Sequence, residues 1–214
     1  MSNKDWKGNR KSVFSTLGAS NHTEHDRAEN DYYATDPIAA DLLCDVETFS
    51  GTIWENSCGE GHLSKRLVQR GYSVISTDLI DRGYGEGGVD FFDCTMSYGN
   101  NIVTNPPYSL SKEWVYHSME LLNNGEKLAL FLPIQFLESE ERRELFNMYP
   151  PRTIYVCSGR ILCGINGNFY KTDDNGNIIL NKKGQPQKMS SAKCYAWFVW
   201  EKGMHTDPII KWIN

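Results

Sequence analysis

The residues with the clearest capacity for chemistry are Asn105-Pro106-Pro107-Tyr108, which directly follow the apolar run NIVT. Two prolines fix φ at both positions and remove two N–H donors, so the carbonyl of Pro106 can point into a pocket beside the Asn105 amide. Tyr108 offers a flat apolar face for stacking. These residues predict a site for a planar group that carries an NH2, and the alternative is a stiff turn without chemistry.

A second candidate site is a short loop that contains Gly59 and Gly61 and lies between a strand-like run and a helix-like segment. Glycine lets the backbone approach a ligand where a side chain would block it. Ser64 stands where a dinucleotide fingerprint has its third glycine, and the loop lacks the Gly-Lys-Ser/Thr of nucleotide kinases. Glu55 before the loop and Asp78 one strand later suit a ligand with hydroxyl groups and positive charge. A purely structural turn is the alternative.

Strands and helices that could position these residues alternate along the chain. Strand-like apolar runs occupy 52–57, 72–79, 101–105, 127–134, 153–158 and 194–201, and helix-like segments occupy 63–71, 111–125 and 139–149. Asp36-Pro37 predicts a further helix start, with Asp36 as its N-cap. This alternation predicts an α/β fold with a mostly parallel sheet and helices on both faces. Ligands bind beyond the carboxyl ends of such strands, where both candidate sites lie.

The motifs and their order resemble those of S-adenosylmethionine-dependent amino-methyltransferases, whose signature is (D/N/S)-P-P-(Y/F/W). The resemblance extends over roughly residues 30–160 and the last strand. It implies a Rossmann-like class I methyltransferase fold with a seven-stranded, mostly parallel sheet. The upstream segment D-Y-Y-A-T-D-P, the glycine loop and N-P-P-Y follow the gamma order of N6-adenine DNA methyltransferases, and they look like the corresponding segments of phage and prophage enzymes.

The resemblance implies S-adenosylmethionine as the cofactor. Asp78 would hold the ribose hydroxyls, Asp90 and Phe91 would contact the adenine ring, and residues 33–35 would pack on the methionine part. In that segment Asp36 stands where the family has a proline. The implied cofactor-binding residues are Tyr33, Thr35, Glu55, Ser57, Gly59, Gly61, Asp78, Asp90, Phe91 and Asn105, and the implied catalytic residues are Asn105, Pro106, Pro107 and Tyr108.

The implied reaction is transfer of a methyl group to the N6 amino group of adenine in double-stranded DNA. Hydrogen bonds from this group to the Asn105 side-chain oxygen and the Pro106 carbonyl would aim the nitrogen lone pair at the sulfonium methyl group. Catalysis would then depend on positioning and electrostatics rather than on a general base. The adenine would be flipped out of the duplex and stacked on Tyr108.

Two other classes of function stay open. The N-P-P-Y motif also serves enzymes that methylate adenine in RNA or a glutamine amide in a protein. A chain that kept only the fold would be a non-catalytic DNA-binding or anti-restriction module. The intact motif, together with the loop glycines and Asp78, favours a site-specific adenine DNA methyltransferase.

Residues 165–191 interrupt the alternation and predict an exposed basic hairpin with a turn at Asp174-Asn175-Gly176. We expect residues 1–30 to form an N-terminal arm and residues 31–214 to form the catalytic domain that carries this insertion. The chain has no room for a separate target-recognition domain, so we expect a short or loose DNA target read by the insertion, the arm or a partner subunit. The predicted nucleic-acid contacts are Tyr108, Phe169, Tyr170, Lys182, Lys183 and Lys188.

Composition sets the remaining expectations. A chain of 214 residues with a net charge of −5 does not indicate nucleic-acid binding by its overall charge. Six cysteines without any C-x-x-C pair, and histidines without metal spacing, argue against a metal site or a disulfide scaffold. The sequence shows no apolar run of about 18 residues and no signal peptide. We therefore expect a cytoplasmic protein of a bacterial or phage-infected cell, a monomer or homodimer, without a membrane partner.

Overall fold

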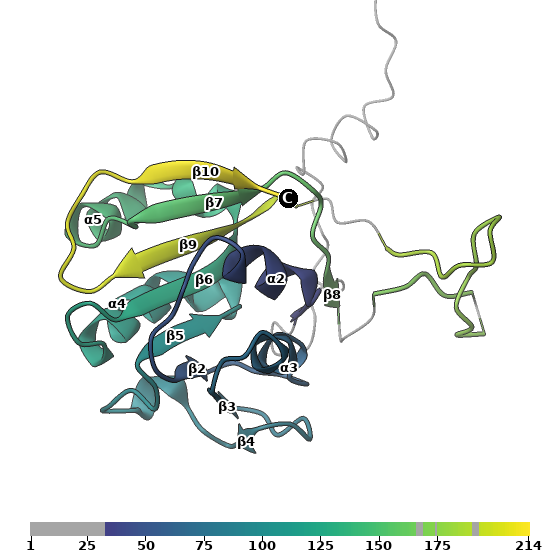
Figure 1. The fold of residues 1–214 in the computed structure, drawn as a ribbon, viewed down its shortest axis with the longest axis horizontal. Helices are drawn as coiled ribbons and strands as arrows, with labels where there is room; N and C mark the ends of the chain where they lie inside the picture. Colours follow the sequence, from purple (N-terminus) through teal and green to yellow (C-terminus); the bar gives the residue numbers. More distant parts are fainter. Residues whose placement is uncertain (1–32, 166–168, 174, 190–192) are drawn as a thin grey trace, which may run out of the picture.

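The computed structural model describes residues 33–165, 169–173, 175–189 and 193–214, and its centre is an eight-stranded sheet (Figure 1). The strand order is β10-β7-β9-β6-β5-β2-β3-β4. The strands are β2 (Ile53–Glu55), β3 (Val74–Asp78), β4 (Glu86–Gly87), β5 (Asn101–Thr104), β6 (Lys127–Pro133), β7 (Thr153–Cys157), β9 (Tyr195–Glu201) and β10 (Ile209–Ile213). All neighbours pair in parallel except β9, which is antiparallel to β6 and β7. The prediction of a mostly parallel α/β sheet is confirmed.

The sheet has eight strands, whereas the family resemblance implied seven and the sequence pattern marked six. Neither edge strand has a clear sequence pattern. The edge strand β4 has only two residues, which is too short for any periodicity. The opposite edge strand, β10, exposes four of its five residues, so it lacks the buried apolar run that marks the central strands. All six inner strands coincide with predicted apolar runs.

Helices cover both faces of the sheet, as predicted. They are α2 (Ile38–Cys44), α3 (His62–Gln69), α4 (Ser111–Leu121) and α5 (Glu140–Met148). One core cluster packs α2 and α3 against the sheet and includes Phe131, whereas the other packs α4 and α5 and includes Leu130. Successive residues of β6 thus enter opposite cores, since side chains alternate across a strand. At the start of α2, Asp36 Oδ1 accepts a hydrogen bond from the Ile38 amide at 3.2 Å. The helix begins at Ile38 with Pro37 as its N-cap, one residue later than predicted.

A small second sheet lies beside the main one and was not predicted. It pairs β1 (Tyr33–Thr35) with β8 (Cys163–Ile165) in antiparallel register, with Thr35 opposite Cys163. Both strands have only three residues, and their pairing joins segments more than a hundred residues apart in the chain. Strand β8 leads directly into the insertion.

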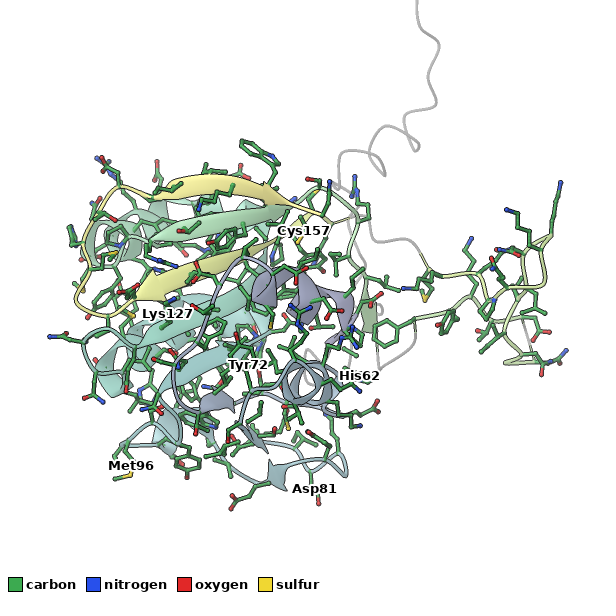
Figure 2. All side chains as sticks on the ribbon, in the orientation of Figure 1. His62, Tyr72, Asp81, Met96, Lys127 and Cys157 are labelled. Atoms are coloured by element: carbon green, nitrogen blue, oxygen red, sulfur yellow. The ribbon has the colours of Figure 1, made fainter. Side chains whose placement is uncertain are left out.

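The insertion extends away from the sheet as an exposed arm, and it contains two turns where one hairpin was expected (Figure 2). Asp173 Oδ1 accepts from the amides of Asn175 and Asn177, and Asn181 Oδ1 accepts from those of Lys183 and Gln185. The second turn therefore repeats the first eight residues later. Sequence reasoning missed it because the Asn-Lys-Lys-Gly turn carries a weaker signal than Asp-Asn-Gly.

Some expectations fall outside the described residues. The predicted N-terminal arm, residues 1–30, and Asp174 of the predicted turn are among them. Within the described ranges, no helix has the length and apolar character needed to cross a membrane. The same ranges contain no cluster of three His, Cys, Asp or Glu side chains suited to a metal ion. All six cysteines carry free thiols.

Candidate active site

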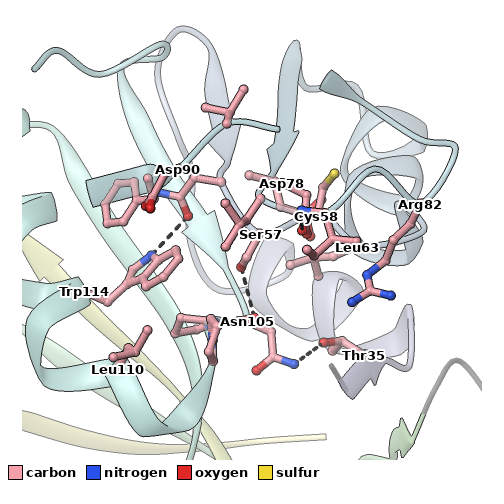
Figure 3. Close-up of a pocket in the computed structure, with 18 of the residues that line it drawn as sticks. Thr35, Ser57, Cys58, Leu63, Asp78, Arg82, Asp90, Asn105, Leu110 and Trp114 are labelled. Atoms are coloured by element: carbon pink, nitrogen blue, oxygen red, sulfur yellow. Dashed lines mark hydrogen bonds between the residues drawn. The ribbon is translucent and has the colours of Figure 1, made fainter. Parts of the chain in front are cut away.

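A pocket opens beyond the carboxyl ends of β2, β3 and β5 and brings most of the predicted site residues together (Figure 3). The predicted residues that line it are Thr35, Glu55, Ser57, Asp78, Asp90, Phe91, Asn105, Pro106, Pro107 and Tyr108. Gly59 and Gly61 belong to the loop between β2 and α3 but do not themselves line the pocket. The side chain of Tyr33 lies outside the described residues. The two motifs thus belong to one site.

The glycine loop is held in place by Asp78. Gly59 and Gly61 have φ of 53° and 76°, in the left-handed region that favours glycine. The Gly59 amide donates to Asp78 Oδ2 at 2.7 Å, and the Ile80 amide donates to Asp78 Oδ1 at 2.9 Å. A Cβ on Gly61 would lie 2.2 Å from the Tyr84 ring. Each Asp78 oxygen can still accept a second hydrogen bond, so this carboxylate can also bind ligand hydroxyls.

Glu55 lies at the end of β2 and is only 2% exposed. It accepts a hydrogen bond from Ser64 of α3, which in turn contacts Ser76 Oγ at 2.6 Å. The pKa of Glu55 is raised to about 8, mainly by burial and to a smaller extent by the negative charge of Asp78, while the Ser64 hydrogen bonds oppose the shift. A positively charged ligand in the pocket would therefore favour the ionised form of Glu55.

Asn105 is fixed at the corner where β5 ends. Its Nδ2 donates to Thr35 Oγ1 at 2.9 Å, and its main-chain carbonyl accepts from Ser57 Oγ at 3.1 Å. Ser57 Oγ also lies 2.6 Å from Thr104 Oγ1. Figure 3 shows the Asn105 amide with its nitrogen directed at Thr35 and its oxygen on the opposite side. Since the nitrogen is engaged with Thr35, the oxygen is the amide atom that could accept a hydrogen bond from a ligand.

Tyr108 follows the two prolines and packs partly against protein. Its hydroxyl donates to Cys163 Sγ at 3.4 Å, and its ring lies 6.1 Å from the Tyr195 ring with a 38° tilt. Lys193 Nζ is 5.3 Å from the Tyr108 ring centroid. Burial raises the pKa of Tyr108 well above its ordinary value, so the hydroxyl stays protonated. One side of the ring lines the pocket, where it can contact a ligand.

Asp90 and Phe91 occupy the other end of the pocket. Asp90 caps a short 3-10 helix, Phe91–Asp93, by accepting from the Phe92 amide at 2.9 Å. Phe91 is 3% exposed and stacks on Trp114 with centroids 4.4 Å apart. Most of its ring therefore belongs to the core. Phe92 is 37% exposed and also lines the pocket, so it offers a larger apolar surface to a ligand.

Several lining residues were not predicted. They are Ala34, Asn56, Cys58, His62, Leu63, Leu79, Ile80, Arg82, Val89, Phe92, Leu110 and Trp114. Leu79, Ile80 and Arg82 follow Asp78 directly, so their place after a strand end was the available signal. Arg82 is the only lysine or arginine that lines the pocket in the described part of the chain, and Figure 3 draws it on the same side of the view as Thr35.

The predicted nucleic-acid residues divide into two groups. The Phe169 ring contacts the His62 ring edge-on with centroids 5.3 Å apart, which places Phe169 at the pocket side of the insertion. Tyr170 and Lys188 form an antiparallel β-bridge. Lys188 forms an ion pair with Asp36 at 2.8 Å, so it anchors the base of the insertion rather than its outer turn. Lys182 and Lys183 are exposed in the second turn.

No protein-family model matches the sequence, and no curated protein matches it either. Solved structures do match. A protein named "putative RNA methyltransferase" from Pyrococcus horikoshii aligns with a TM-score of 0.54 and 11% identity over 92% of this chain and 100% of that one. A protein named "putative class I S-adenosylmethionine-dependent methyltransferase" from Listeria monocytogenes aligns with a TM-score of 0.51 and 10% identity over 94% of this chain and 71% of that one.

A third structure, described as a predicted O-methyltransferase from Agrobacterium tumefaciens, gives a TM-score of 0.50 and 14% identity over 81% of this chain and 85% of that one. The chain has the fold of class I S-adenosylmethionine-dependent methyltransferases. At these identities the likeness shows the fold alone, which confirms the predicted architecture. The pocket lies at the carboxyl ends of the strands, where open α/β sheets bind their ligands.

Proposed function

We propose that the protein transfers a methyl group from S-adenosylmethionine to the N6 amino group of adenine in double-stranded DNA, with short or loose sequence specificity. The observation that carries the proposal is one pocket in which Asp78, Asp90 and the Asn105 amide oxygen converge from neighbouring strand ends. Neither motif alone would support a group transfer, because the reaction needs a donor site and an acceptor site within contact distance.

The pocket residues fit the cofactor by charge and shape. S-adenosylmethionine combines ribose hydroxyls, an adenine, two positive charges and one carboxylate, and it supplies an electrophilic methyl group. Asp78 can accept hydrogen bonds from the ribose hydroxyls, and Asp90 can accept one from the exocyclic amino group of the adenine. Phe92 can contact a face of the adenine ring. Glu55 favours positive charge when ionised. Arg82, at the Thr35 end of the pocket, matches the carboxylate.

Asn105 and Pro106 would hold the nucleophile. The Asn105 Oδ1 accepts one N6–H bond and the Pro106 carbonyl accepts the other, which aims the nitrogen lone pair into the cofactor end of the pocket. S-adenosylmethionine would supply the methyl group and leave as the neutral thioether S-adenosylhomocysteine, and the methylated amino group held by Asn105 and Pro106 would release one proton to solvent. A neutral amide suits this corner, since an unpaired buried carboxylate would be more costly.

The substrate assignment rests on the insertion and on the motif order. Lys182 and Lys183 are exposed on an arm that extends from the pocket side of the molecule, where they can contact phosphates of a duplex. Tyr108 and Phe169 lie close enough to the pocket to stack on a flipped base. We place this activity in the cytoplasm of a bacterial or phage-infected cell, in a restriction-modification setting, with the protein acting as a monomer or homodimer.

The test is transfer of tritiated methyl groups to unmethylated DNA, to RNA and to protein, followed by nucleoside and amino-acid analysis. We expect the label in N6-methyladenine of DNA. Label in RNA adenine alone, or in a protein glutamine, would replace the substrate assignment with one of the rival enzymes. Absence of label in all three, with DNA binding intact, would favour the non-catalytic module.

A further inference from the structure

The small β1–β8 sheet touches both ends of the Asn105–Tyr108 motif through a single residue pair. Thr35 and Cys163 lie directly opposite each other in this sheet. Thr35 Oγ1 accepts from Asn105 Nδ2 at 2.9 Å, and Cys163 Sγ accepts from the Tyr108 hydroxyl at 3.4 Å. Both side chains are buried, with 4% and 9% of their surface exposed. The main sheet fixes the backbone of the motif at the end of β5, whereas Thr35 and Cys163 fix the side chains of Asn105 and Tyr108.

The pair is itself well anchored. The Asp36 amide, next to Thr35, donates to the Leu162 carbonyl, next to Cys163, at 3.0 Å. Lys188 then pairs with Asp36 Oδ2 at 2.8 Å, which ties the base of the insertion to the same point. The Tyr108 ring and the Asn105 amide are therefore both hydrogen-bonded to the small β1–β8 sheet. Contacts from three segments of the chain hold this sheet in place.

We infer that Thr35 and Cys163 are positioning residues for the proposed transfer: Thr35 holds the Asn105 amide with its oxygen toward the substrate, and Cys163 holds the Tyr108 ring at the angle needed for stacking. The inference rests on the proposed function and adds to it. It also differs from the expectation that Thr35 contacts the cofactor, because the Thr35 hydroxyl is engaged with Asn105.

The physical reason is that a side-chain amide turns easily about its last bond. Loss of the Thr35 acceptor raises the population of flipped Asn105 amides, whose Nδ2 would face the donor hydrogens of an amino group and repel them. Misplacement of a reacting group by about 1 Å can cost about 100-fold in rate. The effect should appear in kcat, because the ground-state contacts of the cofactor lie elsewhere in the pocket.

The first experiment compares Thr35→Val with Thr35→Ser. Valine keeps the shape but lacks the acceptor, so we expect kcat to fall roughly 10- to 100-fold with the cofactor Kd unchanged. Serine keeps the hydroxyl and should restore most of the rate. Thr48→Val, at an exposed position outside the pocket, is the control and should match the wild type. A raised cofactor Kd with unchanged kcat would overturn the inference for Thr35.

The second experiment compares Cys163→Ala with Cys163→Ser. Alanine removes the thiol that accepts from the Tyr108 hydroxyl, and we expect a several-fold rise in KM for DNA that serine reverses. Cys44→Ala, at the end of α2, is the matched control. Equal KM values in all three variants would remove Cys163 from the inference.

A measurement independent of activity separates this inference from the proposed function. The side-chain amide signals of Asn105 in a 15N-labelled protein, assigned by their loss in Asn105→Ala, should shift in Thr35→Val and return in Thr35→Ser. If the amide signals shift in Thr35→Val but the wild-type protein does not methylate DNA, the substrate assignment is refuted and the positioning role of Thr35 stands. Unchanged amide signals in Thr35→Val would refute the positioning role.

Discussion

The pocket and the insertion are built by opposite means. Pocket side chains such as Asn105 and Asp78 stand at the ends of buried strands, and contacts from distant parts of the chain fix each of them. The insertion depends on local turns closed by Asp173 and Asn181, and its side chains are largely exposed. The contrast indicates that the sheet positions the chemistry, while the arm can change without disturbing the reacting atoms.

The largest difference should appear in stability, when equivalent glycines in the two regions are changed to alanine. In Gly61→Ala the new Cβ meets the Tyr84 ring at 2.2 Å, and φ is positive, so we expect a loss of about 2–4 kcal/mol. In Gly176→Ala, φ is also positive but nothing lies within 4 Å, so the loss should be about 1 kcal/mol or less. Urea unfolding of both variants measures this. Equal losses would show that the two regions are built alike.

Charge reversal on the arm should affect DNA binding alone. Lys182→Glu with Lys183→Glu removes two predicted phosphate contacts, so we expect the slope of log K against log salt to fall by about 2 and affinity to drop at least tenfold. Cofactor affinity should be unchanged. Lys211→Glu, on the exposed edge strand β10, is the control for charge reversal outside the arm. Unchanged DNA binding in the double variant would exclude the second turn from the interface.

Glu55 should make stability depend on pH. Its pKa is raised from 4.5 to about 8, so between these values the folded protein keeps a proton that the unfolded chain has lost. Stability should therefore fall as pH rises through this window, and cofactor affinity should rise as the carboxylate forms. Glu55→Gln should flatten the stability profile. A profile that keeps its slope in this variant would assign the pH dependence to another group.

The smallest effect should come from the link between the two regions. Lys188 pairs with Asp36, but 58% of its side chain is exposed, so Lys188→Met should cost less than about 1 kcal/mol of stability. The rate at saturating DNA should change less than twofold or so. A larger rate loss, with stability unchanged, would show that the arm controls the pocket through Asp36. Thermal unfolding and steady-state kinetics on one preparation decide between these results.

The buried strands and the residues at their ends could be predicted from the sequence because burial leaves an apolar run and a strand end marks a site. Strands β1, β8 and β10 could not, since each is short or exposed and depends on pairing with a distant segment. The contact between Tyr108 and Cys163 spans 55 residues and has no local pattern. Lys188 was predicted to contact nucleic acid, because its ion-pair partner Asp36 lies 152 residues away in the sequence and could not be recognised.

The same reasoning applies inside the pocket. Asn105 and Asp78 were recognised by residue type and place, whereas Phe92 was missed because the neighbouring Phe91 matched the family pattern. Only the three-dimensional packing shows that Phe91 stacks on Trp114 and that Phe92, which also lines the pocket, is the more exposed of the two rings. Residue type thus indicated the chemistry, and packing decided which of two adjacent rings is available for it.

We propose above all that the Asn105 amide acts in methyl transfer and contributes little to cofactor affinity. The most direct measurement is kcat for DNA together with the cofactor Kd in Asn105→Ala, beside Asn124→Ala at an exposed position outside the pocket. We predict that kcat falls at least roughly 100-fold in Asn105→Ala while Kd stays within about twofold of the wild type, and that Asn124→Ala changes neither. Lost cofactor affinity with intact transfer would contradict the account.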